Sequence, residues 1–448
     1  MAINHKSGRL VVDVGPELKL ELHAALAAHG LSMKDWLIER ARDYLAVRVD
    51  PPTNNSTAGA EIDRPRIAFI TKGPAMSKVQ STLGLAERDW TFATANTRQA
   101  THAVHPYPAK FIPQIPRALI EDLHPGDDSL ILDPFCGSGT TLVEAAAAGL
   151  PSVGIDLNPL ACLISKVKVT PLPCSLDTAA AAVLNRAVKQ PLPPIPRLDH
   201  WFDSSVQEAL ASIVGAIDLE DHSDVRDALR VALSSIVVRV SRQESDTRYA
   251  AISKNVSRYT VEEQFFRAAK TIGDLVSSTW RDALQPRVRI INRNILLATP
   301  EEVGAPVSLV VTSPPYPNAY EYWLYHKYRM YWLGMDPLTI RESEIGSRAH
   351  FFKKNPATAD DFRVQMSHVF RLLRAVIIDG GHACFQVGNS KIHGQVVDNG
   401  ELLRLAGAAH GFCHIETVKR EIPTSRKAFN PSNSRIRNES ILVFRRMP

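Results

Sequence analysis

Residues 312–316 read Thr-Ser-Pro-Pro-Tyr and follow an apolar run, residues 307–311, which predicts a buried strand. Two consecutive prolines cannot continue a sheet or begin an ordinary helix, so the strand ends in a stiff loop. Such a loop fixes a few oxygens and one aromatic face in space, which suits a flat ring carrying an exocyclic amine. The residues assigned to this chemistry are Ser313, Pro314, Pro315 and Tyr316. The alternative interpretation is an ordinary proline-rich turn with a packing tyrosine.

A second stretch, residues 130–141, reads Leu-Ile-Leu-Asp-Pro-Phe-Cys-Gly-Ser-Gly-Thr-Thr and predicts a strand, a glycine-rich turn and a helix start. Gly137 and Gly139 let the backbone approach a ligand, which then faces the amides of the helix N-terminus. Asp156 follows a short strand about twenty residues on, where an acidic side chain can hydrogen-bond a ribose diol. Because threonine and leucine follow Gly139, the stretch departs from the dinucleotide fingerprint Gly-x-Gly-x-x-Gly. It therefore indicates an adenosine-and-amino-acid site rather than a pyrophosphate cradle.

Together these stretches resemble the DNA amino-methyltransferases that use S-adenosylmethionine. That family has an Asp-Pro-Phe-x-Gly-Ser-Gly-Thr-Thr cofactor loop and a Pro-Pro-Tyr or Pro-Pro-Phe loop preceded by Ser, Asp or Asn. Residues 105–111, His-Pro-Tyr-Pro-Ala-Lys-Phe, resemble the segment that closes over the methionine end of the cofactor. The resemblance covers residues 90–445 except for a poorly matched middle, and it implies no metal. The cofactor-binding residues that it implies are Tyr107, Pro108, Ala109, Lys110, Phe111, Asp133, Pro134, Phe135, Gly137, Ser138, Gly139, Thr140, Thr141, Asp156 and Asn158.

The resemblance implies methyl transfer to an amine of a base flipped out of duplex DNA. The Ser313 hydroxyl and the Pro314 carbonyl would accept the amine hydrogens, and proximity and orientation would supply most of the rate. Family members that act on adenine N6 mostly carry Asp or Asn before Pro-Pro, and those that act on cytosine N4 mostly carry Ser. Ser313 therefore favours N4-methylcytosine as the product, with N6-methyladenine as the alternative.

Other functions remain open. The Pro173-Cys174 pair lacks the glycine-rich lead of cytosine-C5 methylases and is interpreted as coincidence, and Cys136 is interpreted as a packing residue. RNA guanine-N2 methylases share similar loops but carry an RNA-binding domain, and protein-glutamine methylases have Asn before Pro-Pro-Tyr. A non-enzymatic DNA-binding regulator with a decayed methylase domain is the remaining alternative.

The elements around these loops predict an α/β fold with a Rossmann-like class I methyltransferase sheet. Residues 66–170 form the cofactor-binding part and residues 288–448 the target-base part, which ends in two antiparallel strands. Strands at residues 375–378 and 382–387 are expected around a turn at Gly380 and Gly381. Residues 171–287 are mostly helical and too long for an ordinary connection, so they predict an inserted subdomain that is a candidate for target recognition.

The N-terminal residues 1–49 resemble a ribbon-helix-helix module. Leu10, Val12 and Val14 alternate as in a strand, Pro16 opens one helix, and Ser32 caps a second. Such a unit is too small to bury a core alone, so the resemblance implies a homodimer, with paired strands in the DNA major groove. A helical hairpin that serves only for dimerisation is the alternative. Residues 50–65, rich in Pro, Asn, Ser and Thr, read as a linker.

Two basic segments predict contact with double-stranded DNA, one in the insert and one in a loop near the C-terminus. The residues are Arg242, Arg248, Lys254, Arg258, Arg426 and Lys427. A solvated helix end and loop is the alternative for the first segment.

The composition bounds these predictions. The net charge of +5 permits nucleic-acid binding without demanding it. The five cysteines form no Cys-x-x-Cys pair, so neither a zinc site nor a disulfide framework is expected. This cysteine usage predicts a cytoplasmic protein. No apolar run of about 18 residues and no signal peptide is found. A restriction-modification system with a cognate nuclease is a possible setting.

Overall fold

The computed structural model describes residues 2–4, 9–11, 83–108, 112–123, 126, 130–246, 248–281, 287–304, 306–318, 320–422 and 438–448. The chain divides into two units, Met1–Ala75 and Met76–Pro448. In the first unit, strands β1 (Ala2–Asn4) and β2 (Arg9–Val11) pair antiparallel. The helices predicted for this unit, and the linker, lie outside the described residues.

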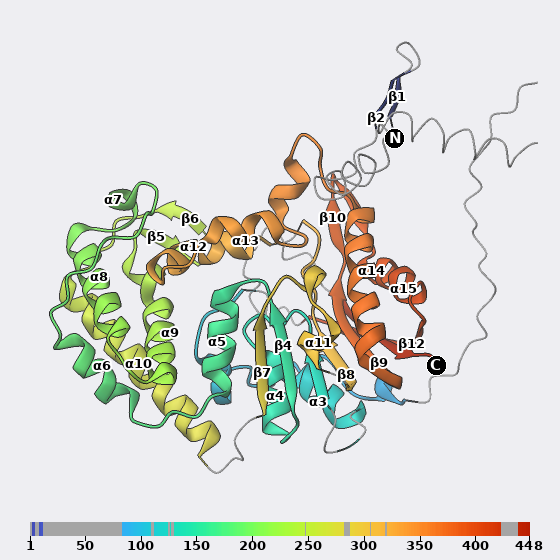
Figure 1. Cartoon of the computed structure of the whole chain (residues 1–448), viewed down its shortest axis with the longest axis horizontal. Coiled ribbons are helices and arrows are strands. Elements are labelled where there is room, and N and C mark those ends of the chain that lie inside the picture. Colours follow the sequence, from blue (N-terminus) through green and yellow to red (C-terminus); the bar gives the residue numbers. More distant parts are fainter. Residues whose placement is uncertain are drawn as a thin grey trace, which may run out of the picture. The chain divides into compact units, whose positions relative to one another are not determined.

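A seven-stranded sheet forms the centre of the second unit, in the order β12-β13-β9-β8-β3-β4-β7 (Figure 1). Its strands are β3 (Leu130–Asp133), β4 (Ser152–Asp156), β7 (Val288–Asn292), β8 (Val307–Thr312), β9 (Ile377–Gly388), β12 (Phe412–Glu421) and β13 (Asn438–Arg446). The strands from β9 to β7 are parallel to their neighbours, and β13 runs antiparallel to β9 and β12. The predicted Rossmann-like methyltransferase sheet is therefore confirmed.

Two apolar layers cover the sheet because alternate strand residues point to opposite faces. Leu132 of β3 lies in one core with Phe370 of α14, whereas Ile131 lies in another with Leu119 of α3. The helices that flank the sheet are α3 (Gln114–Leu123), α4 (Thr140–Ala147), α5 (Pro159–Val169), α11 (Pro300–Val303), α14 (Ala359–Val376) and α15 (Asn399–Ala408). Short 3-10 helices are η1 (Leu85–Glu87), η2 (Ala100–Ala103), η3 (Ile295–Leu297) and η4 (Arg348–Phe352).

The turn expected at Gly380 and Gly381 is wrong, because β9 runs without interruption from Ile377 to Gly388. The pairing with β8 shifts register between Val307 and Leu309, and Gly380 has a φ of +77°. A bulge thus absorbs extra residues within one strand, and glycine supplies the left-handed conformation that it needs.

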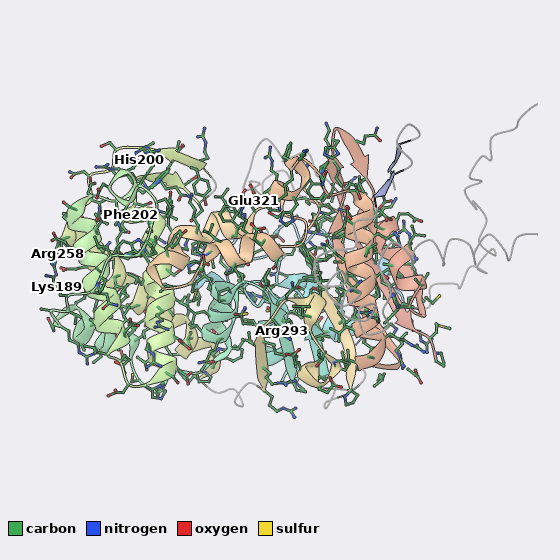
Figure 2. All side chains as sticks on the ribbon, turned by 45° about the horizontal axis from the view of Figure 1, so that its top comes forward. Lys189, His200, Phe202, Arg258, Arg293 and Glu321 are labelled. Carbon is green, nitrogen blue, oxygen red and sulfur yellow. The ribbon has the colours of Figure 1, made fainter. Side chains whose placement is uncertain are left out.

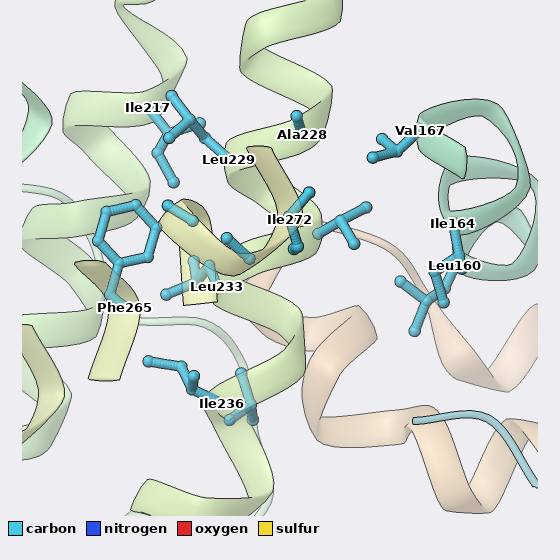
Figure 3. Close-up of a cluster of buried hydrophobic side chains, with 14 of the residues drawn as sticks. Leu160, Ile164, Val167, Ile217, Ala228, Leu229, Leu233, Ile236, Phe265 and Ile272 are labelled. Carbon is cyan, nitrogen blue, oxygen red and sulfur yellow. The ribbon is translucent and has the colours of Figure 1, made fainter. Parts of the chain in front are cut away.

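Between α5 and β7 the chain leaves the sheet and forms a helical insert. Its elements are α6 (Leu176–Leu184), α7 (Leu198–Trp201), α8 (Ser204–Asp218), α9 (Ser223–Val240), β5 (Gln243–Ser245), β6 (Arg248–Ala251) and α10 (Arg258–Trp280). Figure 3 shows Leu233 of α9, Phe265 and Ile272 of α10, and Ile164 of α5 among the side chains of one buried cluster. The insert therefore shares a core with the helix that follows β4.

After β8 come α12 (Tyr322–Trp332), α13 (Pro337–Ser343) and a hairpin of β10 (Ser390–Ile392) and β11 (Gln395–Val397). The side chain of Arg329 in α12 is fully buried and donates to Asp246 beside β5 and to the carbonyl oxygen of Ser234 in α9. Because a buried charge must be paired, this contact fixes α12 against the insert. No helix among the described residues is long and apolar enough to cross a membrane.

Candidate active site

A cleft opens at the carboxyl ends of β3, β4 and β8, where the chain order of the sheet reverses. In parallel α/β sheets this position is where ligands bind. The cleft holds about 850 Å³ of empty space, counting the part open to solvent. The predicted site residues that line it are Tyr107, Pro134, Phe135, Gly137, Ser138, Thr140, Asp156, Asn158, Ser313 and Pro315.

The glycine-rich loop takes its shape from α5, which lies behind it. Ser165 donates a 2.8 Å hydrogen bond to the carbonyl oxygen of Gly137, and Nζ of the buried Lys168 donates a 2.6 Å bond to that of Ser138. Gly139 has a φ of +75°, and a Cβ there would lie 2.8 Å from the Ser165 hydroxyl oxygen. Glycine is therefore required at this position both for its conformation and for the space.

Asp156 lies at the end of β4 and is already partly satisfied. Its two carboxylate oxygens accept 2.8 Å hydrogen bonds from the backbone N–H groups of Gly137 and Asn158. Burial raises the pKa of Asp156 to about 6, although these two hydrogen bonds act to lower it. Each carboxylate oxygen still has a lone pair free, so both can accept from a ribose diol.

Two further polar atoms on the cleft lining await a partner. Within the described part of the chain, the Ser138 hydroxyl and the Nδ2 of Asn158 are buried and make no hydrogen bond. Buried polar atoms are normally satisfied, so these two fit a polar ligand. Together with Asp156 and the glycine-rich loop, they match the hydroxyl, amino and carboxylate groups of S-adenosylmethionine.

Asp133 does not line the cleft but joins its two loops. Its Oδ1 accepts a 2.6 Å hydrogen bond from the Thr312 hydroxyl and a 3.1 Å bond from the N–H of Phe135. The Thr141 hydroxyl donates a second hydrogen bond, 3.1 Å long, to the carbonyl oxygen of Val311. Burial raises the pKa of Asp133 to about 6. The glycine-rich loop and the Ser-Pro-Pro-Tyr loop are thus held in one fixed arrangement.

On the target side, Ser313 and Pro315 face the cleft, whereas the buried Pro314 and the half-buried Tyr316 do not line it. The hydroxyl of Tyr316 donates 3.4 Å to the carbonyl oxygen of Gln386 on β9. Its ring is therefore fixed against the sheet. The role assigned to Tyr316, stacking on the target base, stays a prediction.

Tyr107 closes the cleft from the upstream segment. Its ring stacks on that of Tyr322, with centroids 6.0 Å apart, and on that of the buried His326, 4.9 Å apart. His105 anchors the same segment to the insert through a 3.0 Å hydrogen bond between its Nε2 and the Ser234 hydroxyl. Pro108 is buried without lining the cleft, and Ala109, Lys110 and Phe111 lie outside the described residues.

Comparison with known proteins bears on this arrangement. Residues 68–167 match a family model described as DNA methylase, of the N6 and N4 type. The chain is 30% identical over 259 residues to the type II methyltransferase M.MvaI of Kocuria varians, covering 50% of this chain and 55% of that protein. It is 25% identical over 292 residues to the type II methyltransferase M.BsoBI of Geobacillus stearothermophilus, covering 55% of each. In these parts the chain is similar to the DNA amino-methyltransferases.

The chain spans about half the length of these two curated relatives. Among solved structures, TrmN from Thermus thermophilus matches with a TM-score of 0.32 and 10% identity, over 75% of this chain and 49% of that one. The rRNA methyltransferase AviRa from Streptomyces viridochromogenes matches with a TM-score of 0.30 and 12% identity, over 76% and 87% of the two chains.

The polar groups on the cleft lining fit S-adenosylmethionine as the cofactor. Within the described ranges, no group of three or more His, Cys, Asp or Glu side chains is placed to hold a metal ion. Cys136 lies on the cleft lining, and burial raises the pKa of its thiol well above the usual range. A protonated thiol is a poor nucleophile, which agrees with the packing role expected for it.

Several residues on the lining of this cleft were not expected from the sequence. Arg293, Asn294 and Ile295 follow β7 and extend the cleft beyond Asp156, whose carbonyl oxygen accepts a 3.0 Å bond from the N–H of Arg293. In Figure 2, Arg293 is labelled over the central sheet, to the right of the insert. The sequence did offer one signal for these three residues, because they come directly after a strand of the parallel sheet. Glu344 also lines the cleft, and for this residue the sequence offered no signal.

The residues predicted to contact DNA divide into two kinds. Arg242 pairs with Asp203, and Lys254 donates to the carbonyl oxygens of Val238 and Gln243, so both serve the fold of the insert. Arg248 is 72% exposed on the β5–β6 hairpin beside α12, and pairs with Glu244. Arg258 pairs with Glu262 and lies at the outer edge of the insert, far from Arg293 (Figure 2).

The second basic segment is only partly described. Arg426 and Lys427 lie outside the described residues. Arg420, which begins that segment, is buried, pairs with Glu439 and donates to the carbonyl oxygen of Trp90. It is therefore part of the fold at this edge of the sheet.

Proposed function

We propose that this protein transfers a methyl group from S-adenosylmethionine to the exocyclic N4 amine of a cytosine flipped out of duplex DNA. The observation that carries the proposal is the Thr312–Asp133 hydrogen bond, which holds the glycine-rich loop and the Ser-Pro-Pro-Tyr loop on one cleft. A cofactor loop and an amine-binding loop at one fixed separation are what a direct transfer needs. Ser313, rather than Asp or Asn, before the two prolines supports cytosine as the base.

The residues divide the work between the two ends of the cleft. When bound, S-adenosylmethionine supplies an activated methyl group on a sulfonium. Asp156 accepts from the ribose hydroxyls, and Ser138 and Asn158 bind polar groups of the cofactor. Tyr107 and Tyr322 exclude water. The Ser313 hydroxyl accepts a hydrogen of the amine and turns its lone pair towards the methyl group. Orientation in this sense accounts for most of the acceleration, so no covalent intermediate with the protein is needed.

The experiment is transfer of labelled methyl from S-adenosylmethionine to mixed-sequence duplex DNA, followed by digestion and separation of the nucleosides. We expect N4-methylcytosine, and a fall of at least about 100-fold in transfer by Ser313→Ala, because that variant loses an acceptor for the amine. Ser278→Ala is the matched control, since Ser278 is exposed on α10 and does not line the cleft.

Each of the other outcomes would overturn a different part of the proposal. N6-methyladenine would retain amine methylation of DNA and overturn cytosine as the base. Absence of label from DNA, with cofactor still bound, would overturn DNA as the substrate. A homodimer through residues 1–49, contact of that module with DNA, and a cognate nuclease stay predictions from the sequence.

A further inference from the structure

Glu344 follows α13 and is a buried carboxyl group on the cleft that the function described above does not use. Its side chain is 6% exposed and lines the same cleft as Ser313. Oε1 accepts a 2.8 Å hydrogen bond from the N–H of Tyr322 at the start of α12. Oε2 is buried and has no hydrogen-bond partner among the described residues. An unsatisfied carboxyl oxygen in such a place is costly, and it fits a donor that arrives with a ligand.

The segment that carries Glu344 is fixed against the Ser-Pro-Pro-Tyr loop. The carbonyl oxygen of Gly346 accepts a 2.9 Å bond from the N–H of Asn318. Gly346 has a φ of +70°, and a Cβ there would lie 2.9 Å from the carbonyl oxygen of Tyr316. Ile345 and Tyr316 pack in one apolar cluster. Glu344 therefore lies on the wall next to the loop that carries Ser313, where the target amine would bind.

The groups around Glu344 favour its neutral form. Burial raises the pKa of Glu344 to about 8, although the N–H groups of Tyr322 and Trp323 act to lower it. The charge of Glu321 adds to the rise. In turn, after burial, the charge of Glu344 contributes to raising the pKa values of Tyr107, Tyr322 and Tyr325.

Two charged side chains of opposite sign lie on the far side of the cleft from Glu344. Asp156 lies across the cleft, and Arg293, the cation on its lining, is paired with Glu302 at 3.4 Å. A positive charge brought into the cleft favours the ionised form of Glu344, and its loss favours the neutral form.

We propose that Glu344 is the proton acceptor of the methyl transfer, an inference that rests on the function proposed above. The new carbon–nitrogen bond uses the nitrogen lone pair, and the electrons of the carbon–sulfur bond return to sulfur. The proton that the amine loses goes to Oε2 of Glu344, and the N–H electron pair stays on nitrogen. The cationic sulfur and the carboxylate are both neutral afterwards, so the cleft ends with the charge it had before the transfer.

A purely structural role is the alternative, because Oε1 of Glu344 satisfies an N–H at the beginning of α12. Glu344→Gln separates the two roles, since the amide oxygen can still accept from Tyr322 but the amide takes up no proton at neutral pH. Glu342→Gln is the matched control, because Glu342 lies two residues away with a side chain that is 67% exposed.

The first measurement needs no DNA. Titration calorimetry at pH 8 in buffers of different ionisation enthalpy counts the protons released when S-adenosylmethionine binds, and S-adenosylhomocysteine serves as the uncharged counterpart. We expect the wild-type protein and Glu342→Gln to release a larger fraction of a proton with the sulfonium form. Glu344→Gln should show no such difference. Equal proton counts for the wild type and Glu344→Gln would overturn the inference.

The second measurement is the turnover of duplex DNA between pH 6 and 9. We expect kcat of the wild type to rise with pH to a plateau, and kcat of Glu344→Gln to fall by about 100-fold and lose that rise, as for a general base. Cofactor affinity of the variant should stay within a few-fold. A variant with the wild-type pH profile would overturn the inference alone, whereas a wild type that methylates no DNA overturns the proposed function and the inference with it.

Discussion

The two ends of the cleft are encoded in different ways. The cofactor end comes from one continuous stretch, residues 130–158, in which a strand, a glycine-rich turn, a helix and a second strand follow each other. The target end is assembled from residues 313–318, 322 and 343–346, which meet only in the folded chain. The comparison teaches that a site fixed by backbone conformation leaves a continuous motif. When a site is fixed by packing between distant segments, only some of its residues can be predicted from the sequence.

Gly139→Ala tests the cofactor end, where the largest effect is expected. The added methyl group would lie 2.8 Å from the hydroxyl oxygen and 3.1 Å from the Cα of Ser165, so the loop must move away from α5. We expect cofactor affinity to fall by at least about 100-fold, because the loop amides and the Ser138 and Asn158 side chains lose their common geometry. Calorimetric titration with S-adenosylmethionine measures this directly.

Gly149→Ala is the control for conformation alone. Gly149 has a φ of +74°, almost that of Gly139, but nothing lies within 4 Å of its Cβ position. Alanine there should cost about 1–2 kcal/mol of folding free energy and leave cofactor affinity unchanged. Equal losses of affinity in both variants would show that left-handed strain, and not crowding by Ser165, shapes the loop.

Sequence patterns predicted the elements of the sheet and the two loops because each depends on near neighbours in the chain. The glycine-rich turn, the strand before it and Asp156 after it are local signals, and the structure brings them to one cleft with Ser313. Gly380 and Gly381 misled the prediction because glycine marks a bulge as well as a turn, and only the pairing with β8 distinguishes them. Glu344 left no signal, since its burial depends on α12 and on the Ser-Pro-Pro-Tyr loop.

Thr312→Val sharpens the comparison at the point where the two ends meet. Valine keeps the shape of threonine but removes the 2.6 Å hydrogen bond to Asp133, whose pKa is already raised to about 6 by burial. We expect kcat for DNA to fall by about 10-fold with cofactor affinity nearly unchanged, because the variant alters the separation of the two loops rather than either loop.

The same variant has a pH-dependent effect on stability. A carboxyl group with a raised pKa favours the folded state when protonated, so its contribution to stability falls as pH rises from the unfolded value of about 4 to the folded value. Loss of the Thr312 donor raises that folded pKa further. We therefore expect Thr312→Val to lose about 1–2 kcal/mol at pH 8 and less at pH 5, in melts of both proteins. Ser308→Ala, which removes a hydroxyl between the same two strands at their other end, should show no such pH dependence.

The insert shows the same contrast on a smaller scale. Arg242 and Lys254 satisfy a carboxylate and carbonyl oxygens of the insert itself, although the sequence presents them as members of a basic cluster. Tertiary contacts that no local pattern reveals thus decide which cations remain available. Arg248 remains exposed on a hairpin that contacts α12 through the ring pair of Tyr249 and Tyr328.

Arg248→Ala is expected to give the smallest effect and to test whether the insert belongs to the target end. The exposed ion pair with Glu244 adds little to folding, so the free energy of unfolding should change by less than about 0.5 kcal/mol. If the hairpin contacts a phosphate, duplex affinity should fall several-fold and the slope of log K against log salt should decrease by about 1. Binding measured at three salt concentrations checks both.

Arg267→Ala separates a specific contact from general attraction. Arg267 is 74% exposed on α10 and pairs with Glu263, so its exposure and pairing match those of Arg248, but it lies on a helix rather than on the hairpin beside α12. Because net charge changes equally in both variants, a loss confined to Arg248→Ala would place the DNA along the hairpin. An equal loss in both would mean that the insert only adds to the field of the protein, and that target recognition depends on residues nearer the cleft.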